Sequence, residues 1–264
     1  MELKTLRTAL AASLLAITAG YATQASAAIF TFTEYGGFTA DVPASIATYS
    51  NQVSTSSPPN TAGGGTDAAP NAVYSTMSWV TNQSPQSSLV LSTVTGPAAL
   101  PFAVWTTIST LTHNNLIIPS ATNWGPQDIW GRFILTDSDG ASTVRLDSDE
   151  PITITLFTET QNEAPCPAPN PNGSTCDDNF TYTLAGLNSL LFTANNGTNW
   201  IADFRLNALP GTTVIGDTVY TAEARSSSLN VQVRVSQIPE PATLALMGVG
   251  LLGLGLSRRR QLKG

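Results

Sequence analysis

Charged residues are scarce in this chain. Only 11% of its 264 residues are Asp, Glu, Lys or Arg, whereas a soluble domain usually carries about 25%. Two cysteines and one histidine exclude a disulfide-dense scaffold, a four-cysteine zinc site and a polyhistidine metal centre. The hydrophobic content of 42% can supply a packed core, so the composition is that of a folded protein rather than a disordered one.

Basic residues are almost absent from the middle of the chain. Residues 28–237 contain 5 arginines, no lysine and 16 of the 18 acidic residues, all except Glu2 and Glu240, which gives a net charge near -11. Nucleic-acid binding requires a basic surface. We therefore expect no nucleic-acid partner.

The first 27 residues have the pattern of a secretory signal peptide. Lys4 and Arg7 precede an apolar run over 8–20, and Ala25-Ser26-Ala27 supplies a small-x-small cleavage site. This order of charge, apolar run and small residues predicts export by the Sec machinery, with cleavage after Ala27. The exported body is then residues 28–237.

The end of the chain has a second pattern of this kind. Pro239-Glu240-Pro241 precedes an apolar run over 242–257, which Arg258, Arg259 and Arg260 follow. A spanning helix needs roughly 17–25 residues, so this run predicts a short transmembrane helix, which its glycines weaken further. The arginines place the end of the chain in the cytoplasm. We expect the apolar run to anchor the protein in the membrane only temporarily, with a permanent tail anchor as the alternative.

These three parts, over residues 238–264, resemble the PEP-CTERM sorting signal of Gram-negative bacteria, also named the ice-binding protein C-terminal type of tail. The resemblance implies that an exosortase, a transpeptidase-like membrane enzyme, recognises Pro239, Glu240 and Pro241. It implies that the arginine cluster stops translocation, leaving an inner-membrane intermediate. Sorting to the cell surface or extracellular matrix would follow, in an organism that makes extracellular polysaccharide.

The exported body has the pattern of an all-β domain. Val231, Val233 and Val235 alternate with polar residues, as expected of a strand with one buried face. About eleven such segments predict a two-sheet β-sandwich or jelly roll, and residues from about 50 to 71 predict a flexible surface loop. The predicted strands are 29–35, 73–80, 89–94, 104–111, 131–136, 144–146, 152–157, 182–184, 200–205, 218–224 and 231–236.

Thr112, His113 and Asn115 form a Thr-His-x-Asn stretch. It is similar to the signature of the THxN family of PEP-CTERM proteins, and the resemblance covers roughly residues 72–237. The family implies no activity, so the role of these residues is open. A catalytic histidine needs a nucleophile or an orienting carboxylate, and no Gly-x-Ser-x-Gly motif supplies one. We expect His113 to form a structural hydrogen bond at a strand end; metal ligation and catalysis are the alternatives.

Cys166 and Cys176 are predicted to form a disulfide, because export places them in an oxidising compartment. The bond would close an exposed loop rich in proline between two strands. Closing a loop of this length stabilises the fold by about 2.8 kcal/mol in the chain-entropy model.

Two acidic pairs are candidate cation sites. Asp137 and Asp139 stand beside Gly140 with the alternate spacing that can hold calcium. The same Asp-Gly sequence is also typical of a hairpin turn, which we favour, so we expect no required cofactor and keep calcium as the alternative. Asp177 and Asp178 form a weaker second pair.

The sequence as a whole favours a non-enzymatic structural protein of the cell surface or matrix, with exopolysaccharide as a candidate contact. A lectin-like carbohydrate-binding module is the alternative, and its stacking platform would come from Trp79, Trp105, Trp124, Trp130 or Trp200. A glycoside hydrolase is the third hypothesis and requires paired carboxylates. The glutamates of the body show no recognisable pairing: Glu34, Glu150, Glu159, Glu163 and Glu223.

Overall fold

The computed structural model describes residues 30–238, apart from gaps at 54–71, 80–83, 85, 95, 118–122, 138–142, 148–151, 161–164, 167–168, 184–188 and 195–197. The predicted signal peptide, the Pro-Glu-Pro motif, the apolar run and the arginine cluster lie outside the described residues. Within the described part, no helix is long and apolar enough to cross a membrane.

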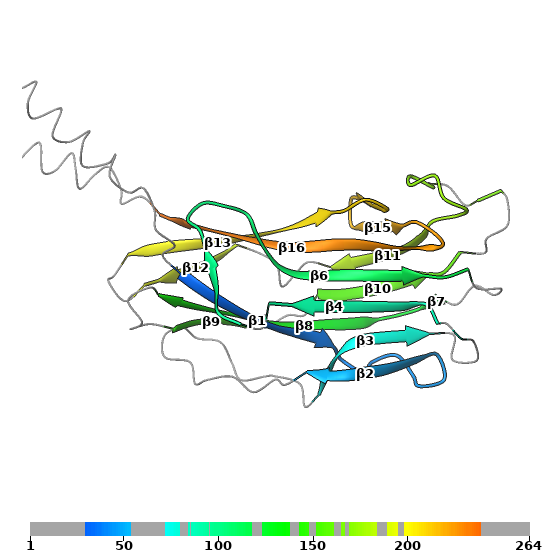
Figure 1. Cartoon of the computed structure of the whole chain (residues 1–264), viewed down its shortest axis with the longest axis horizontal. Coiled ribbons are helices and arrows are strands. Elements are labelled where there is room, and N and C mark those ends of the chain that lie inside the picture. Colours follow the sequence, from blue (N-terminus) through cyan, green and yellow to red (C-terminus); the bar gives the residue numbers. More distant parts are fainter. Residues whose placement is uncertain are drawn as a thin grey trace, which may run out of the picture.

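The described chain is built from β-strands and their connections, which confirms the all-β prediction (Figure 1). All eleven predicted ranges overlap observed strands. The sixteen strands are β1 (Phe30–Phe38), β2 (Ala47–Val53), β3 (Val73–Trp79), β4 (Ser88–Thr93), β5 (Ala98–Leu100), β6 (Thr106–Asn115), β7 (Asn123–Trp124), β8 (Gln127–Asp137), β9 (Thr143–Asp147), β10 (Ile152–Thr158), β11 (Asp178–Thr183), β12 (Leu190–Thr193), β13 (Asn199–Ala208), β14 (Thr212–Ile215), β15 (Thr218–Thr221) and β16 (Arg225–Gln237).

Five of these strands have no counterpart in the prediction: β2, β5, β7, β12 and β14. β5, β7, β12 and β14 have two to four residues, too few to show an alternation. β2 (Ala47–Val53) includes residues 50–53, which were predicted to belong to a loop running from about 50 to 71. The remainder of that predicted loop, 54–71, lies outside the described residues.

The strands form one curled antiparallel sheet of sixteen strands rather than two separate sheets of about eleven strands in total. Its main path runs β12-β13-β16-β6-β4-β3-β1-β8-β10-β11-β15-β14. The two halves of this path meet where β3 pairs with β1, through the single registered pair Phe38–Tyr74. The body is therefore close to a two-layer arrangement, but the pairing of β1 with β3 joins its two halves. We call this pairing the seam.

The curled sheet packs its inner face against itself in two apolar clusters. One cluster joins Phe30 and Phe32 of β1 to Val233 and Val235 of β16. The other surrounds Trp79 of β3, which is fully buried. The alternation predicted for β16 is confirmed, because its valines are buried while the residues between them are partly exposed. Burial of these apolar side chains is the main driving force for the fold.

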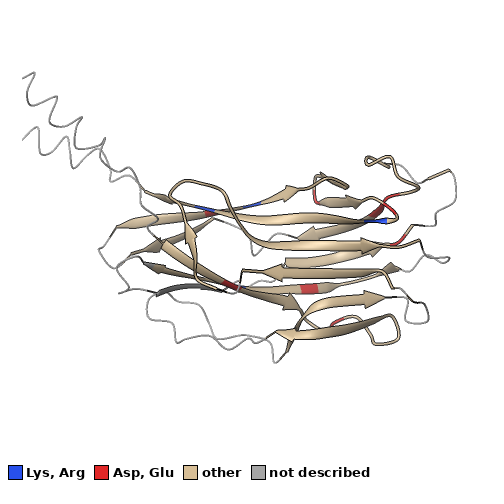
Figure 2. Ribbon diagram, viewed as in Figure 1, with Lys and Arg blue, Asp and Glu red and all other residues tan. Residues whose placement is uncertain are grey.

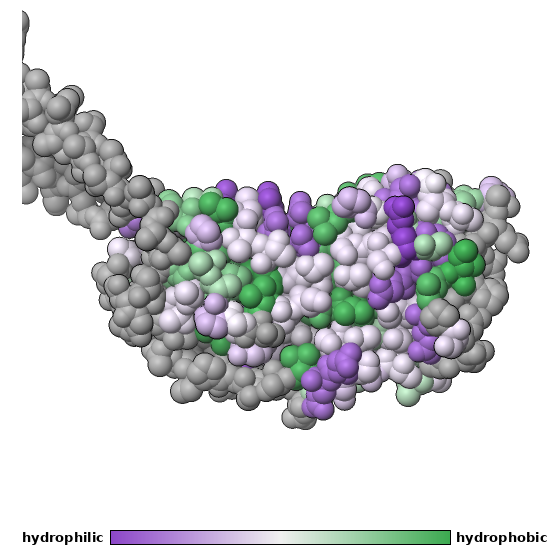
Figure 3. Space-filling model, viewed as in Figure 1, coloured by the Kyte–Doolittle hydropathy of each residue, from purple (hydrophilic) through white to green (hydrophobic). Residues whose placement is uncertain are grey.

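The start of β1 and the end of β16 lie at the same end of the body, on the left in Figure 1. β16 has 13 residues, so its far end is about 40 Å away. Charged residues are sparse along the ribbon in Figure 2. The face in Figure 3 is mostly weakly polar, with scattered apolar and strongly hydrophilic residues. The elongated body therefore has one end from which the tail leaves and one free end.

Candidate functional site

The Thr-His-x-Asn stretch ends β6, at the free end of the body. Successive residues of a strand point to opposite faces, so His113 and Asn115 point inward and are 2% and 0% exposed. Thr112 lies on the other face, where its hydroxyl is hydrogen-bonded to that of Ser228, 3.0 Å away. β6 pairs with β4 on one side and with β16 on the other. The stretch therefore lies inside the sheet and not at one of its edges.

His113 forms a hydrogen bond across the interior of the body. Its Nδ1 lies 2.8 Å from the Thr221 hydroxyl, which in turn donates to the backbone carbonyl of Asp178 at 3.4 Å. Because the Thr221 hydroxyl donates its proton to Asp178, it accepts a hydrogen bond from His113. The proton of the neutral imidazole is therefore assigned to Nδ1. Burial lowers the pKa of His113 to about 3, so the ring stays neutral and packs beside Trp79, with 5.3 Å between ring centres.

The space around His113 is small. A cavity of about 10 Å³ lies between His113, Thr212 and Ser227, close to the volume that one water molecule requires. Each of these three residues has a buried side-chain polar atom without a hydrogen-bond partner. A cavity of this size cannot admit a saccharide or peptide substrate to His113.

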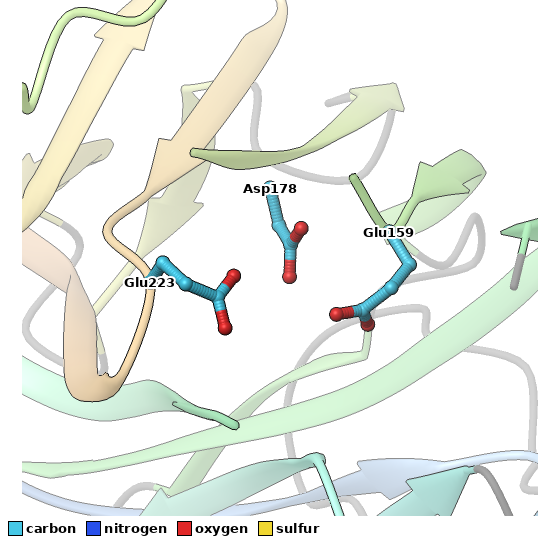
Figure 4. A group of neighbouring side chains, drawn as sticks. All are labelled: Glu159, Asp178 and Glu223. Atoms are coloured by element: carbon cyan, nitrogen blue, oxygen red, sulfur yellow. The ribbon is translucent and has the colours of Figure 1, made fainter. Parts of the chain in front are cut away.

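Three carboxyl groups meet next to this stretch. Glu159 directly follows β10, Asp178 begins β11 and Glu223 follows β15. One oxygen from each lies within 4.8 Å of the others, and Figure 4 shows the side chains pointing toward one another. Glu159, Asp178 and Glu223 are 1%, 0% and 5% exposed. We call these three residues the acidic cluster.

Glu159 and Asp178 each accept a hydrogen bond at one carboxyl oxygen. The Trp79 Nε1–H donates to Glu159 Oε2 at 2.8 Å, and the Thr160 backbone N–H donates to Asp178 Oδ1 at 2.7 Å. The Asn115 side chain also hydrogen-bonds Asp178. The Glu159 and Asp178 side chains also hydrogen-bond each other, which requires a proton on one of the two carboxyl groups.

The environment of the acidic cluster favours added positive charge. Burial is the main cause that raises the pKa of Glu159 to about 9, and the negative charge of Asp178 is the second. Burial also raises the pKa of Asp178 to about 6, although hydrogen bonds from Thr160 oppose the rise. Neither carboxylate forms an ion pair with a basic side chain in the described part of the chain. A proton or a bound cation would relieve this concentration of negative charge.

The predicted disulfide between Cys166 and Cys176 is present. The loop that it closes contacts the acidic cluster. The Asp177 carboxylate accepts hydrogen bonds from the Asn172 backbone N–H and from the Ser174 hydroxyl. The Ser174 hydroxyl in turn accepts from the backbone N–H of Glu223 at 3.0 Å. Asp177 therefore holds the disulfide loop in shape.

Of the two acidic pairs that the sequence suggested, the structure describes the side chains of Asp177 and Asp178 only. Asp177 and Asp178 are adjacent but face different surroundings, and only Asp178 belongs to the acidic cluster. Asp139 lies outside the described residues, and Asp137 ends β8 without a described side chain. The sequence does not reveal the grouping of Glu159 with Glu223, because only the pairing of β11 with β10 and β15 brings them together.

Most of the tryptophans from which a stacking platform could come are buried. Four of the five tryptophans are 0–5% exposed and belong to the interior: Trp79, Trp124, Trp130 and Trp200. Trp105 is partly exposed. The guanidinium carbons of Arg205 and Arg234 lie 4.3 and 4.7 Å from the centre of its ring.

Comparison with known proteins identifies the tail. Residues 237–260 match the PEP-CTERM protein-sorting motif, which confirms the sorting-signal part of the resemblance. The match begins at Gln237, the last residue of β16. No curated protein shows a significant match to the chain. The motif implies a bacterial protein that is exported and sorted to the cell surface, with an exosortase as its processing enzyme.

Proposed function

We propose that residues 28–237 form a non-enzymatic structural module of the cell surface or extracellular matrix, of the THxN type, in a Gram-negative bacterium. One observation carries this proposal. The sorting motif starts at Gln237, where the last strand ends, so the folded body is joined directly to the signal that directs it outward. Exopolysaccharide is the contact that we propose for the exposed body.

The non-enzymatic part of the proposal is supported by the burial of the reactive groups. His113 and the acidic cluster are enclosed, and the cavity beside His113 is about 10 Å³. Glycoside hydrolysis requires two carboxyl groups that flank a bound sugar, and buried carboxyls without such a space do not meet that requirement. These groups therefore act within the fold.

The route that we propose uses both ends of the chain. The signal peptide over 1–27 directs Sec export, and the apolar run over 242–257 holds the protein in the inner membrane until the exosortase acts at Pro239-Glu240-Pro241. β16 leads from the free end of the body to this tail, so the free end would project away from the membrane (Figure 1).

Replacement of Pro239, Glu240 and Pro241 by alanine tests this route. We expect uncleaved protein to accumulate in the inner membrane, because the exosortase loses its recognition motif while the apolar run remains. Cell fractionation followed by immunoblotting measures this. Replacement of Gln261 and Leu262 by alanine is the matched control and should leave release unchanged. Normal release of the first variant would refute the route.

A carbohydrate-binding module remains the second candidate because of Trp105. Its ring is partly exposed beside two arginines, and an aromatic ring next to cationic groups suits an acidic polysaccharide. If this function holds, Trp105→Ala should reduce binding to purified host exopolysaccharide at least tenfold, and Trp105→Phe should retain part of it. Equal binding by wild type and Trp105→Ala would exclude this surface.

A further inference from the structure

We propose that the carboxyl groups of Glu159 and Asp178 share one proton that keeps the free end of the body closed. Loss of this proton loosens the loop that the Cys166–Cys176 disulfide closes. This proton switch is independent of the sorting function, because it involves the interior of the free end and not the tail.

Strand pairing places the two side chains opposite each other. Thr158 of β10 pairs with Asn179 of β11 in the antiparallel ladder. Glu159 and Asp178 are the next residues along these two chain segments. Side chains at directly opposite positions lie on the same face, with about 4.5–5.5 Å between their Cβ atoms, and like charges at such a pair are destabilising. The ladder therefore brings together two carboxyl groups that repel each other if both are ionised.

Burial makes a proton between them necessary. Glu159 and Asp178 are 1% and 0% exposed, so water cannot screen a repulsion between them. Their side chains hydrogen-bond each other, and an ionised carboxylate can only accept hydrogen bonds. One carboxyl group must therefore carry the proton while the other accepts it. The Trp79 indole and the Thr160 backbone N–H hold the pair in position by donating to its outer oxygens.

The surroundings of the pair add negative charge. Glu223 is the third carboxyl group of the acidic cluster, and its charge also raises the pKa of Glu159. Three other ionisable side chains lie on the elements around the pair. His113 on β6 is neutral, Asp177 accepts hydrogen bonds within the disulfide loop, and Arg225 at the start of β16 is exposed. Loss of the shared proton would leave adjacent negative charges in buried surroundings.

The pair is connected directly to the disulfide loop. The hydroxyl of Thr160, which follows Glu159, donates to the Cys176 carbonyl oxygen at 2.7 Å. The Ser174 hydroxyl accepts from the backbone N–H of Glu223 at 3.0 Å. These two anchors of the loop are therefore held by the acidic cluster and the residue next to it. Movement of Glu159 away from its partner would break the Thr160 anchor and loosen the loop.

The direction of the pH dependence follows from burial. Burial raises the pKa of Glu159 from 4.5 to about 9 and that of Asp178 to about 6, so the pair carries one proton between these two pH values. The closed form holds this proton more tightly than an open form in which Glu159 meets water. The stability that Glu159 contributes to the closed form is complete below pH 4.5 and decreases as the pH rises toward about 9. The free end should therefore loosen in alkaline solution.

Hydrogen exchange of the full chain in detergent micelles tests the switch. The backbone N–H groups of Thr160 and Glu223 report on the two anchors. We expect their protection, corrected for the intrinsic exchange rate, to fall by about tenfold for each pH unit above pH 6, because opening releases one proton. Val233, in the other apolar cluster, should stay more strongly protected, because the opening is local. Protection that does not change with pH, or that is equal at Thr160 and Val233, would overturn the proposal.

One substitution separates the shared proton from other causes. Glu159→Gln keeps the side-chain size and supplies an amide N–H that can donate to Asp178 at every pH, so the pH dependence at the two anchors should disappear. Glu34→Gln is the matched control, because Glu34 is also buried but is not part of the acidic cluster, and it should keep the dependence. An unchanged pH dependence in Glu159→Gln would show that another group controls the opening.

The Trp79 indole provides a readout in the wild-type chain that does not depend on the folding of a variant. Its Nε1–H donates to Glu159 Oε2 at 2.8 Å, so its proton NMR frequency should follow the ionisation of Glu159. We expect this frequency to titrate above neutral pH, near pH 9. The absence of a titration above neutral pH would mean that the pair holds no shared proton there and would contradict the proposal.

Discussion

At the scale of single residues, burial decides the charge of several ionisable side chains. Glu34 lies in the middle of β1 and is 7% exposed. Burial raises its pKa to about 8, although a hydrogen bond with Ser109 opposes the rise. His113 shows the opposite case of a buried base, because burial lowers its pKa and keeps the ring neutral. Both residues are uncharged in the folded protein at neutral pH.

Glu34 should make the fold less stable as the pH rises. In the unfolded chain its pKa is near 4.5, whereas in the folded protein it is about 8, so between these values the folded state binds more protons. Stability contributed by Glu34 is therefore complete below pH 4.5 and falls until about pH 8. Glu34→Gln should raise the urea midpoint at pH 8 and leave it nearly unchanged at pH 4.5.

A urea titration of both proteins at several pH values measures this difference. The expected gain at pH 8 is several kcal/mol, since each unit of pKa difference corresponds to about 1.4 kcal/mol. A gain that is the same at every pH would mean that the titration of Glu34 is not its cause.

At the scale of the strands, the sequence predicts where strands lie better than how they pair. The valines of β16 alternate and are buried as predicted, because alternation is a local property of the strand. The seam between β1 and β3 depends instead on Gly37. A Cβ atom on Gly37 would lie 2.9 Å from both the backbone nitrogen and the backbone oxygen of Tyr74. No pattern within β1 reveals that contact, so the sequence suggests two sheets instead of one.

Gly37→Ala should therefore destabilise the fold, by about 2 kcal/mol or more, because the backbone of β3 must move away. Gly131→Ala is the matched control: Gly131 also lies in a strand, and an added Cβ meets nothing within 4 Å there. Urea unfolding should show a change within about 0.5 kcal/mol for this control. Equal effects of the two substitutions would contradict the role given to the seam.

The candidate site shows the same division between local and long-range information. The sequence singles out Thr112, His113 and Asn115 as a motif, and the alternation of β6 sets which of them point inward. The partners Glu159 and Glu223 come from strands that pair only in the fold. Their grouping could not be predicted, because nothing in their spacing encodes the order of strands in the sheet.

At the scale of the whole molecule, the two ends of the body have different roles. The sorting motif begins where β16 ends, and the Thr-His-x-Asn stretch, the acidic cluster and the disulfide lie at the free end. The sequence predicts the tail well, since a sorting signal is read as a linear segment. The exported module is thus a curled β-sheet whose distal end carries its most constrained polar groups.

The mass and location of the mature protein in its native host test this account most directly. We predict a chain that begins at Ala28, ends near Pro239 and is found at the cell surface, in the matrix or in the medium. Intact-mass spectrometry on each cell fraction gives both answers at once. A full-length tail in the inner membrane would contradict exosortase processing and make the protein a simple membrane-anchored one.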